Sequence, residues 1–191
     1  MMTEDREEVP KSLVCQAIEG NRWAYGKIYR LCYEDVFDYI IRRVGNRGDA
    51  EDLTMKVFVK GLESISRYEE RGLSVRAWFY RIAHNLVVDH YRTLKKELEL
   101  SDLPEVVDTG RDIDLEMVRR ETVSDVYEEI RKMPTAQAEV LILRFMEDMS
   151  VTETAMILEK KEATVRALQF KGVNNLKKRM AEKEREPEAN G

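Results

Sequence analysis

The sequence predicts an all-α protein made of two helical domains. Its 191 residues include 9 glycines and 4 prolines, fewer than the many turns of a β-sandwich or barrel require. Apolar residues recur every three or four positions along most of the chain, as they do on one face of a helix. We find no alternation of apolar and polar residues long enough to indicate a strand. These observations favour helices throughout.

The first predicted domain spans residues 10–96 and starts with a long helical pattern. Its apolar positions include Trp23, Ile28 and Val36, and the segment GNRG at 45–48 interrupts it. A second helix is predicted from Asp49 onward. Its apolar residues are Leu53, Val57, Phe58, Leu62 and Ile65.

The segment AWFYRIAHNLVVDHYR, residues 77–92, predicts a helix with two ordered stripes, and Ser74 is its expected N-cap. One stripe is sufficient to pack the helix and contains Phe79, Ile82, Ala83, Leu86 and His90. The other stripe contains Trp78, Arg81, Asn85, Asp89 and Arg92. Such a stripe can bind phosphate, contact a base edge and stack a base. The alternative is an ordinary solvated helix face with an Asp89–Arg92 ion pair.

The loop before this helix mixes cations with aromatic side chains. Its members are Arg67, Tyr68, Arg71, Arg76 and Trp78. Proteins that bind single-stranded nucleic acid use this mixture, because charge follows the backbone and rings contact unstacked bases. An ordinary exposed loop is nearly as good an interpretation of this segment taken alone.

Residues 97–116 have a different character and are predicted to form an acidic inter-domain linker. The stretch contains Pro104 and Gly110, and its helical periodicity is weak. The block from 97 to 121 carries 9 acidic and 3 basic residues, whereas residues 21–96 carry 15 basic and 10 acidic. The net charge of -5 therefore hides a local basic balance that is compatible with phosphate binding.

The second predicted domain, residues 117–180, ends in a helix-turn-helix. Ser150 and Glu153 have the spacing of a capping box at the start of a short helix, 151–158. A tight turn follows, and then a basic helix from Glu162 to about Met180. Its outward-facing polar residues could contact phosphates and base edges in a major groove. The alternative is a helical hairpin that binds protein.

Catalysis, metal binding and membrane insertion have no support in the sequence. Cys15 and Cys32 are isolated, as expected of reduced thiols in a cytoplasmic protein. His84 and His90 lack ligands at metal spacing, and no phosphate loop or nucleophile motif occurs. The acidic start lacks the apolar core of a signal peptide, and no apolar run approaches the roughly 18 residues of a membrane span. We therefore expect a cytoplasmic protein without cofactor or enzyme activity.

The order of these motifs resembles one family. DAEDLTMKVFVKGLESI is followed by AWFYRIAHNLVVDHYR, an acidic linker and a C-terminal helix-turn-helix. This arrangement is similar to that of bacterial RNA polymerase sigma factors of the extracytoplasmic-function (ECF) group, over about residues 10–180. Two departures concern the helix-turn-helix: Glu159 stands where the family usually has Gly, and Lys161 replaces the usual Ser cap.

The resemblance implies a role for each segment. Residues 10–96 would be the region 2 domain and 117–180 the region 4 domain. The implied contacts with core RNA polymerase are Asp49, Asp52, Leu53, Lys56, Val57 and Phe58. Those with the minus-ten promoter element, which the protein would also melt, are Arg67, Tyr68, Arg76, Trp78, Arg81, Asn85, Asp89 and Arg92. Those with the minus-thirty-five element are Lys160, Lys161, Thr164, Arg166, Gln169, Lys171 and Asn174. An anti-sigma factor is a further implied partner.

Two other functions stay open at this point. A stand-alone helix-turn-helix regulator would bind duplex DNA without polymerase and would use its N-terminal domain for sensing or dimerisation. A helical adaptor would bind protein alone. The aromatic and basic loop favours the sigma factor, because a duplex-binding protein has little use for it.

Overall fold

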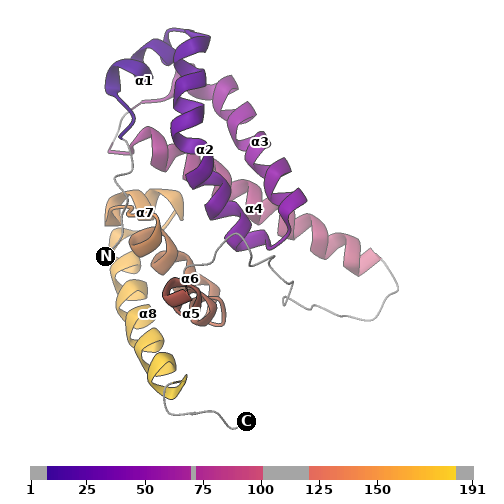
Figure 1. Ribbon diagram of the computed structural model, residues 1–191, viewed down its shortest axis with the longest axis vertical. Helices are drawn as coiled ribbons and strands as arrows, with labels where there is room; N and C mark the ends of the chain where they lie inside the picture. The colour runs from indigo at the N-terminus through magenta and orange to yellow at the C-terminus, as the bar shows by residue number, and fades with distance from the viewer. Residues whose placement is uncertain (1–7, 70–71, 101–120, 184–191) are drawn as a thin grey trace. The chain divides into compact units, whose positions relative to one another are not determined.

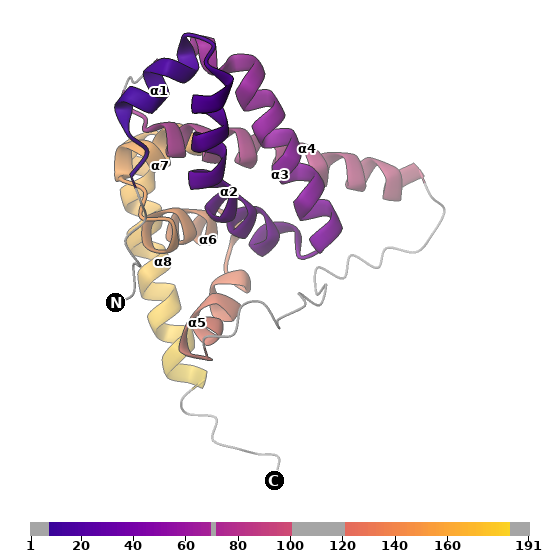
Figure 2. The same cartoon turned by 45° about the horizontal axis from the view of Figure 1, so that its top comes forward.

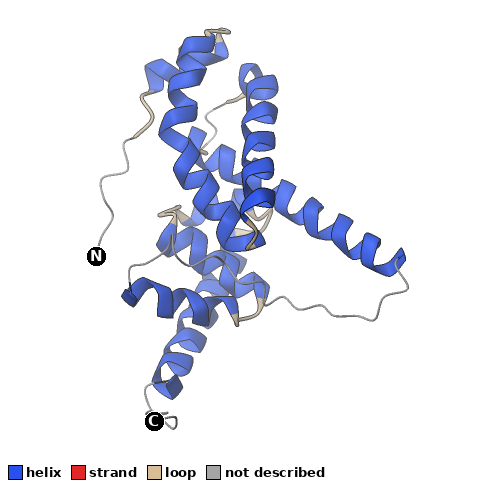
Figure 3. Ribbon diagram, turned by 45° about the vertical axis from the view of Figure 1, so that its right-hand side comes forward, coloured by secondary structure: helices blue, strands red, loops and turns tan. Residues whose placement is uncertain are grey.

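The computed structural model describes residues 8–69, 72–100 and 121–183, and the described residues contain helices and short loops but no strand (Figure 3). The all-α prediction is therefore confirmed. The chain divides into two compact units, with the boundary between Asp114 and Leu115. Each unit is described by itself.

The described residues of the N-terminal unit form four α-helices. They are α1 (Lys11–Ile18), α2 (Arg22–Val44), α3 (Arg47–Ser64) and α4 (Val75–Leu100), with a short 3₁₀ turn, η1 (Ile65–Arg67), after α3. Helices α2 and α3 lie side by side, and α4 crosses both of them (Figures 1 and 2). One end of α4 extends beyond these crossings (Figure 3).

Side-chain caps fix where these helices begin. The side chain of Asn21 accepts hydrogen bonds from the first turn of α2, and Asn46 caps α3 by accepting from the Asp49 N–H. Helix α3 therefore begins two residues before the predicted start at Asp49. The Ser74 hydroxyl accepts from the Ala77 N–H at 3.2 Å, which confirms the expected cap of α4.

Aromatic side chains fill the centre of this unit. Tyr39, Phe79 and Tyr80 are fully buried, and the rings of Phe58 and Phe79 lie 4.9 Å apart. Helix α3 can approach this centre because Gly61 has no side chain. A Cβ atom at Gly61 would lie 2.6 Å from the Phe79 ring, which is closer than packed atoms can come.

The described helix α4 is longer than the sequence predicts. It continues to Leu100, whereas the acidic linker was predicted to start at residue 97. The remainder of that predicted linker, residues 101–116, lies outside the described residues, as do the first residues, 117–120, of the second predicted domain.

The C-terminal unit consists of α5 (Glu121–Arg131), α6 (Thr135–Leu141), a π-helical turn η3 (Ile142–Met146), α7 (Val151–Ile157) and the long helix α8 (Glu162–Lys183). Helix α8 packs against α6 and α7 (Figure 2). Leu141, Ile157 and Val165 are buried between these helices. Gly172 permits the contact with α6, since a Cβ atom there would lie 3.1 Å from Leu141.

Helices α7 and α8 form the predicted helix-turn-helix. The Ser150–Glu153 capping box is present in full. Ala155 is buried, and its carbonyl accepts the Lys160 N–H at 2.9 Å across the turn. Glu159 has a φ of 53°, so this turn keeps the left-handed geometry that normally favours glycine.

Candidate nucleic-acid interface

The outer stripe of α4 lies on the solvent side of the N-terminal unit. Arg81, Asn85, Asp89 and Arg92 are exposed, and Trp78 is half-buried. Asp89 and Arg92 form an ion pair at 2.8 Å with side chains 53% and 69% exposed. Exposed pairs of this kind contribute at most about 1 kcal/mol, so Arg92 can exchange its partner for a phosphate at little cost.

The Trp78 ring is held in place by two neighbouring rings. Tyr68 lies 5.3 Å and Phe79 5.0 Å from it, measured between ring centroids. Tyr68, a predicted DNA contact, is buried, and its hydroxyl donates to the Leu73 carbonyl at 2.6 Å. The Tyr68 ring therefore supports Trp78 from the interior of the unit. The sequence had instead suggested that Tyr68 is exposed and contacts bases.

The two described arginines of the preceding loop differ in position. Arg67 is exposed at the end of η1. Arg76 forms an ion pair with Asp35 of α2, and its side chain is 12% exposed. Arg76 thus fastens the first turn of α4 to α2, a role that the sequence pattern did not indicate. Arg71 lies outside the described residues.

The six predicted polymerase contacts on α3 differ in their exposure to solvent. Leu53, Val57 and Phe58 are between 0% and 4% exposed and belong to the core. Asp52 and Lys56 are exposed. Asp49 is half-buried, with its carboxylate 3.8 Å from the ring of His90. A buried side chain cannot touch a partner directly, so the outward surface of α3 must come from other residues.

Three apolar residues on α3 are exposed; the sequence analysis did not name Met55 or Val59 as candidates, and it counted Leu62 with the apolar residues of the helix. Met55, Val59 and Leu62 are 55%, 48% and 48% exposed. Their spacing places them on one side of the helix. Apolar residues occupy so many positions of α3 that the pattern alone did not separate the outward stripe from the inward one.

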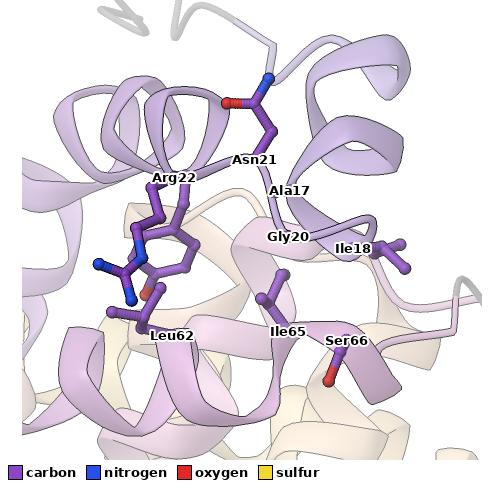
Figure 4. A pocket seen from close by; sticks show the side chains of 9 residues that line it. Ala17, Ile18, Gly20, Asn21, Arg22, Leu62, Ile65 and Ser66 are labelled. Atoms are coloured by element: carbon purple, nitrogen blue, oxygen red, sulfur yellow. The ribbon is translucent and has the colours of Figure 1, made fainter.

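A hollow of about 310 Å³ lies where α1, the start of α2 and the end of α3 meet (Figure 4). Leu62, Ile65 and Ala17 line it, and Arg22 lies at its edge (Figure 4). The Tyr25 hydroxyl in its wall donates to the Phe58 carbonyl at 2.6 Å, and burial raises the pKa of Tyr25. Its lining contains no His, Cys, Asp or Glu side chain.

The outward face of α8 carries most of the predicted duplex contacts. Six of the seven candidates are exposed: Lys160, Lys161, Thr164, Arg166, Lys171 and Asn174. The Arg166 guanidinium is 2.9 Å from the Glu162 carboxylate, which also accepts the Thr152 hydroxyl at 2.7 Å. Thr152 of α7 therefore orients the Glu162 carboxylate, and Glu162 in turn orients Arg166.

The seventh candidate, Gln169, is half-buried. Its side-chain oxygen accepts from the Arg144 guanidinium at 3.2 Å, and Arg144 also donates to the Met149 carbonyl. Gln169 therefore joins α8 to the π-helical turn η3. The next residue, Phe170, is 71% exposed, and the sequence analysis did not single it out.

Ionic contacts join the far end of α8 to α5. Glu129 is buried and accepts from Lys132 at 2.7 Å and Arg179 at 2.9 Å. Hydrogen bonds from these two cations lower the pKa of Glu129. Lys183 adds an exposed contact with Asp125 at 2.9 Å. These pairs fix the orientation of the long helix.

Within the described ranges, no cluster of three His, Cys, Asp or Glu side chains could hold a metal ion. Cys15 is exposed and Cys32 is buried, and burial raises the pKa of the Cys32 thiol to about 11. None of the helices searched in the described part of the chain is long and apolar enough to cross a membrane.

Comparison with known proteins identifies both units. The family model for sigma-70 region 2 matches residues 28–97, and the model for sigma-70 region 4 matches residues 124–176. The chain is 34% identical over 169 residues to the ECF RNA polymerase sigma factor BldN of Streptomyces coelicolor. That match covers 86% of this chain and 63% of BldN, so the chain spans less than two thirds of that relative.

Another relative, the RNA polymerase sigma factor YlaC of Bacillus subtilis, is 30% identical over 164 residues, which cover 84% of this chain and 94% of YlaC. The fold is that of CnrH in its complex with the cytosolic domain of CnrY, with a TM-score of 0.67, 21% identity and coverage of 91% and 98% of the two chains. It is also that of the sigma factor RpoE bound to the anti-sigma factor NepR from Bartonella quintana, with a TM-score of 0.64, 19% identity and coverage of 81% and 94%. The chain belongs to the ECF group of RNA polymerase sigma factors, which direct promoter-specific initiation of transcription.

Proposed function

We propose that this sigma factor binds core RNA polymerase through α3, melts the minus-ten element with α4 and reads the minus-thirty-five element with α8. The observation that carries the proposal is the exposed stripe of α4 that begins at the supported ring of Trp78. A protein that binds duplex DNA alone has little use for such a ring, whereas an unstacked base can lie against it.

The proposed contacts with melted DNA are of three chemical kinds: stacking, charge and hydrogen bonding. Trp78 offers a stacking surface, Arg81 and Arg92 offer charge to phosphates, and Asn85 offers an amide to a base edge. Asp89 orients Arg92 through their ion pair. Arg67 adds an exposed cation at the end of the preceding turn. The buried Tyr68 supports Trp78 from within, and the half-buried Arg76 holds the start of α4 on α2.

The polymerase surface of α3 is the exposed stripe rather than the buried one. We propose direct contacts from Asp52, Lys56 and the three exposed apolar residues, Met55, Val59 and Leu62. Leu53, Val57 and Phe58 then act from the core, where they fix the position of α3. Asp49 lies at the start of the same helix, next to His90.

In the C-terminal unit the proposed duplex contacts are the exposed members of the α8 set. Lys160 and Lys161 precede the helix and supply charge to phosphates, and Thr164, Arg166, Lys171 and Asn174 face the groove. Gln169 contributes to this surface indirectly, because its hydrogen bond with Arg144 holds α8 in position. In this proposal residues 10–96 are the region 2 domain, residues 117–180 the region 4 domain, and residues 97–116 connect them.

The proposal implies a cellular location and a further partner. The protein acts in the cytoplasm as a specificity subunit without catalysis of its own, because the chemistry belongs to the polymerase. An anti-sigma factor is a further proposed partner, supported by the solved relative that is bound to one. The stand-alone regulator and the adaptor are less well supported, since the region 2 match has no counterpart in either role.

Promoter-dependent transcription tests this proposal. The full chain is incubated with sigma-free bacterial core polymerase and a genomic promoter library, and transcript starts are sequenced. We expect discrete starts with shared upstream elements, and their loss with Asn85→Ala or Val59→Asp. The proposal would be rejected in favour of the stand-alone regulator if the protein alone binds duplex DNA specifically and gives no discrete transcript starts when polymerase is present.

A further inference from the structure

The hollow between α1, α2 and α3 belongs to none of the surfaces assigned above. Its volume is about 310 Å³, and its apolar lining consists of Ala17, Ile18, Leu62 and Ile65. Leu62 and Ile65 rise from the end of α3 and from η1 toward the connection between α1 and α2 (Figure 4). Gly20 of this connection leaves space, since a Cβ atom there would meet no atom within 4 Å. Small-molecule sites usually measure roughly 300–1,000 Å³, so this hollow suits a small ligand.

One cation lies at the edge of the hollow without a counter-ion. Arg22 is exposed and forms no ion pair with any other residue that the structure describes. Helix α2 begins at Arg22 and has no acidic residue in its first turn, so the positive end of the helix dipole adds to the guanidinium charge. The lining of the hollow contains no Asp or Glu side chain that would repel an anion. The edge therefore favours a negatively charged group beside an apolar interior.

Leu62 connects the hollow to the proposed polymerase surface. Its side chain lines the hollow and is also 48% exposed at the end of the outward stripe of α3, after Met55 and Val59. On the other side of the hollow, Ser66 of η1 belongs to the lining and precedes the exposed Arg67. A molecule in the hollow therefore contacts the end of the stripe and alters the surface that α3 offers to polymerase.

We propose that the hollow binds a small carboxylate with a short apolar chain, and that this ligand competes with core polymerase for Leu62. Arg22 binds the carboxylate, and the apolar chain lies against Ile18 and Ile65. A guanidinium can hold a carboxylate through two parallel hydrogen bonds, which neither an alcohol nor an amine can reproduce. The volume admits a short chain but not a helix, which is about 10 Å wide with its side chains. Only the effect on polymerase rests on the proposed function.

Unbranched carboxylates from butanoate to decanoate test the site on the full chain alone. Backbone amide chemical shifts in α1, at the start of α2 and in η1 report binding. We expect affinity to rise about fourfold for each added CH₂ group until the hollow is full, and then to stay constant. Octylamine and octanol match octanoate in chain length and should bind about tenfold more weakly or worse, because they lose the charged hydrogen bonds with Arg22.

Arg22→Glu and Arg30→Glu form a matched pair, since each reverses one exposed charge on α2. Arg30 has no ion pair within the described ranges and is not part of the lining. Arg22→Glu should weaken octanoate binding about tenfold or more, as should Arg22→Gln, whereas Arg30→Glu should bind like the wild type. The site is overturned if chain length has no effect, if octylamine binds as well as octanoate, or if the two charge reversals behave alike.

Competition with polymerase is measured separately. Octanoate at ten times its Kd should weaken binding of the wild-type chain to sigma-free core polymerase about tenfold and should leave Arg22→Gln unaffected. Octanoate binding that leaves core affinity unchanged would overturn the proposed competition. A chain that binds octanoate but never binds core polymerase would reject the proposed function itself and, with it, the competition.

Discussion

Helices α4 and α8 each place an aromatic ring on their outer face, but they hold it differently. Trp78 is half-buried and rests against Tyr68 and Phe79. Phe170 is 71% exposed. A ring fixed by its neighbours loses little side-chain entropy when a flat base stacks on it, whereas an exposed side chain becomes ordered only when its partner covers it. The first arrangement suits an unstacked base and the second suits a groove.

The two units also use part of their positive charge internally. Arg76 is paired with Asp35 in the N-terminal unit, and Arg144 is bound to Gln169 and Met149 in the C-terminal unit. Arg76 belongs to a basic segment that a count of charges would assign to DNA, whereas Arg144 is the one cation of the segment 135–150. Since these cations position a helix or its turn, less positive charge is available to the proposed DNA surfaces than the sequence suggests.

The largest effect is expected from Trp78→Ala, which removes the fixed ring. Stacking of a base on an aromatic side chain contributes about 1–3 kcal/mol, so affinity of the holoenzyme for a single-stranded minus-ten oligonucleotide should fall about 10- to 100-fold. Fluorescence anisotropy measures this affinity. Arg166→Ala is the control and should leave single-strand affinity unchanged. Equal losses in both variants would contradict the division of labour between α4 and α8.

A second comparison concerns two glycines at helix contacts. Gly61→Ala should lower the free energy of unfolding by about 1–3 kcal/mol, since its Cβ would lie 2.6 Å from the Phe79 ring in an aromatic core. Gly172→Ala should stay within about 1 kcal/mol of the wild type, because a 3.1 Å approach to Leu141 is offset by better helix propensity.

Urea unfolding can assign each glycine effect to its unit. Both tryptophans, Trp23 and Trp78, lie in the N-terminal unit, so tryptophan fluorescence follows that unit and circular dichroism follows both. Gly61→Ala should shift the fluorescence transition to lower urea. A larger shift for Gly172→Ala in this signal would contradict the packing described for α3.

The contact between α5 and α8 should respond to acid. Cations lower the pKa of Glu129 in the folded state below its ordinary value of 4.5. The resulting stabilisation is therefore present above pH 4.5 and is lost as the pH falls through the folded pKa. Glu129→Gln should cost about 1–3 kcal/mol at neutral pH and weaken this acid dependence. Unfolding followed by circular dichroism at several pH values checks both effects, and an unchanged acid profile would exclude Glu129 as the cause.

The smallest effect is expected at the turn of the helix-turn-helix. Glu159 has a φ of 53°, a conformation that costs a residue with a side chain about 1 kcal/mol relative to glycine. Glu159→Gly should therefore stabilise the C-terminal unit by about that amount in thermal unfolding. Glu159→Ala removes the charge but keeps the strain, so it should not stabilise. Equal stabilisation by both variants would attribute the effect to charge.

The sequence predicted helix type and order well, because caps and periodicity are local. Ser74 and the Ser150–Glu153 box lie where the residue spacing placed them. The end of α4 was predicted less well. Residues 97–100 are acidic and were assigned to a linker, yet the helix continues to Leu100, since polar residues do not by themselves end a helix.

Which stripe of a helix faces outward was harder to predict than where the helix lies. On α3 the buried Val57 and the exposed Val59 are the same residue type, and their difference arises from packing against α2 and α4. Tyr68 and Arg76 look like DNA contacts in a list of residue types. Their burial depends on Leu73 and Asp35, partners that the spacing of the segment did not reveal.

Permanganate footprinting of the promoter complex tests the central claim most directly, because permanganate oxidises unstacked thymines. We predict that the wild-type holoenzyme exposes reactive thymines within the minus-ten element. In DNase I footprints of the same complexes Trp78→Ala should still protect the minus-thirty-five element, yet its minus-ten thymines should stay unreactive to permanganate. Phe170→Ala should lose both signals at low protein concentration and recover both at high concentration. Full minus-ten reactivity with Trp78→Ala would contradict the assignment of promoter melting to α4.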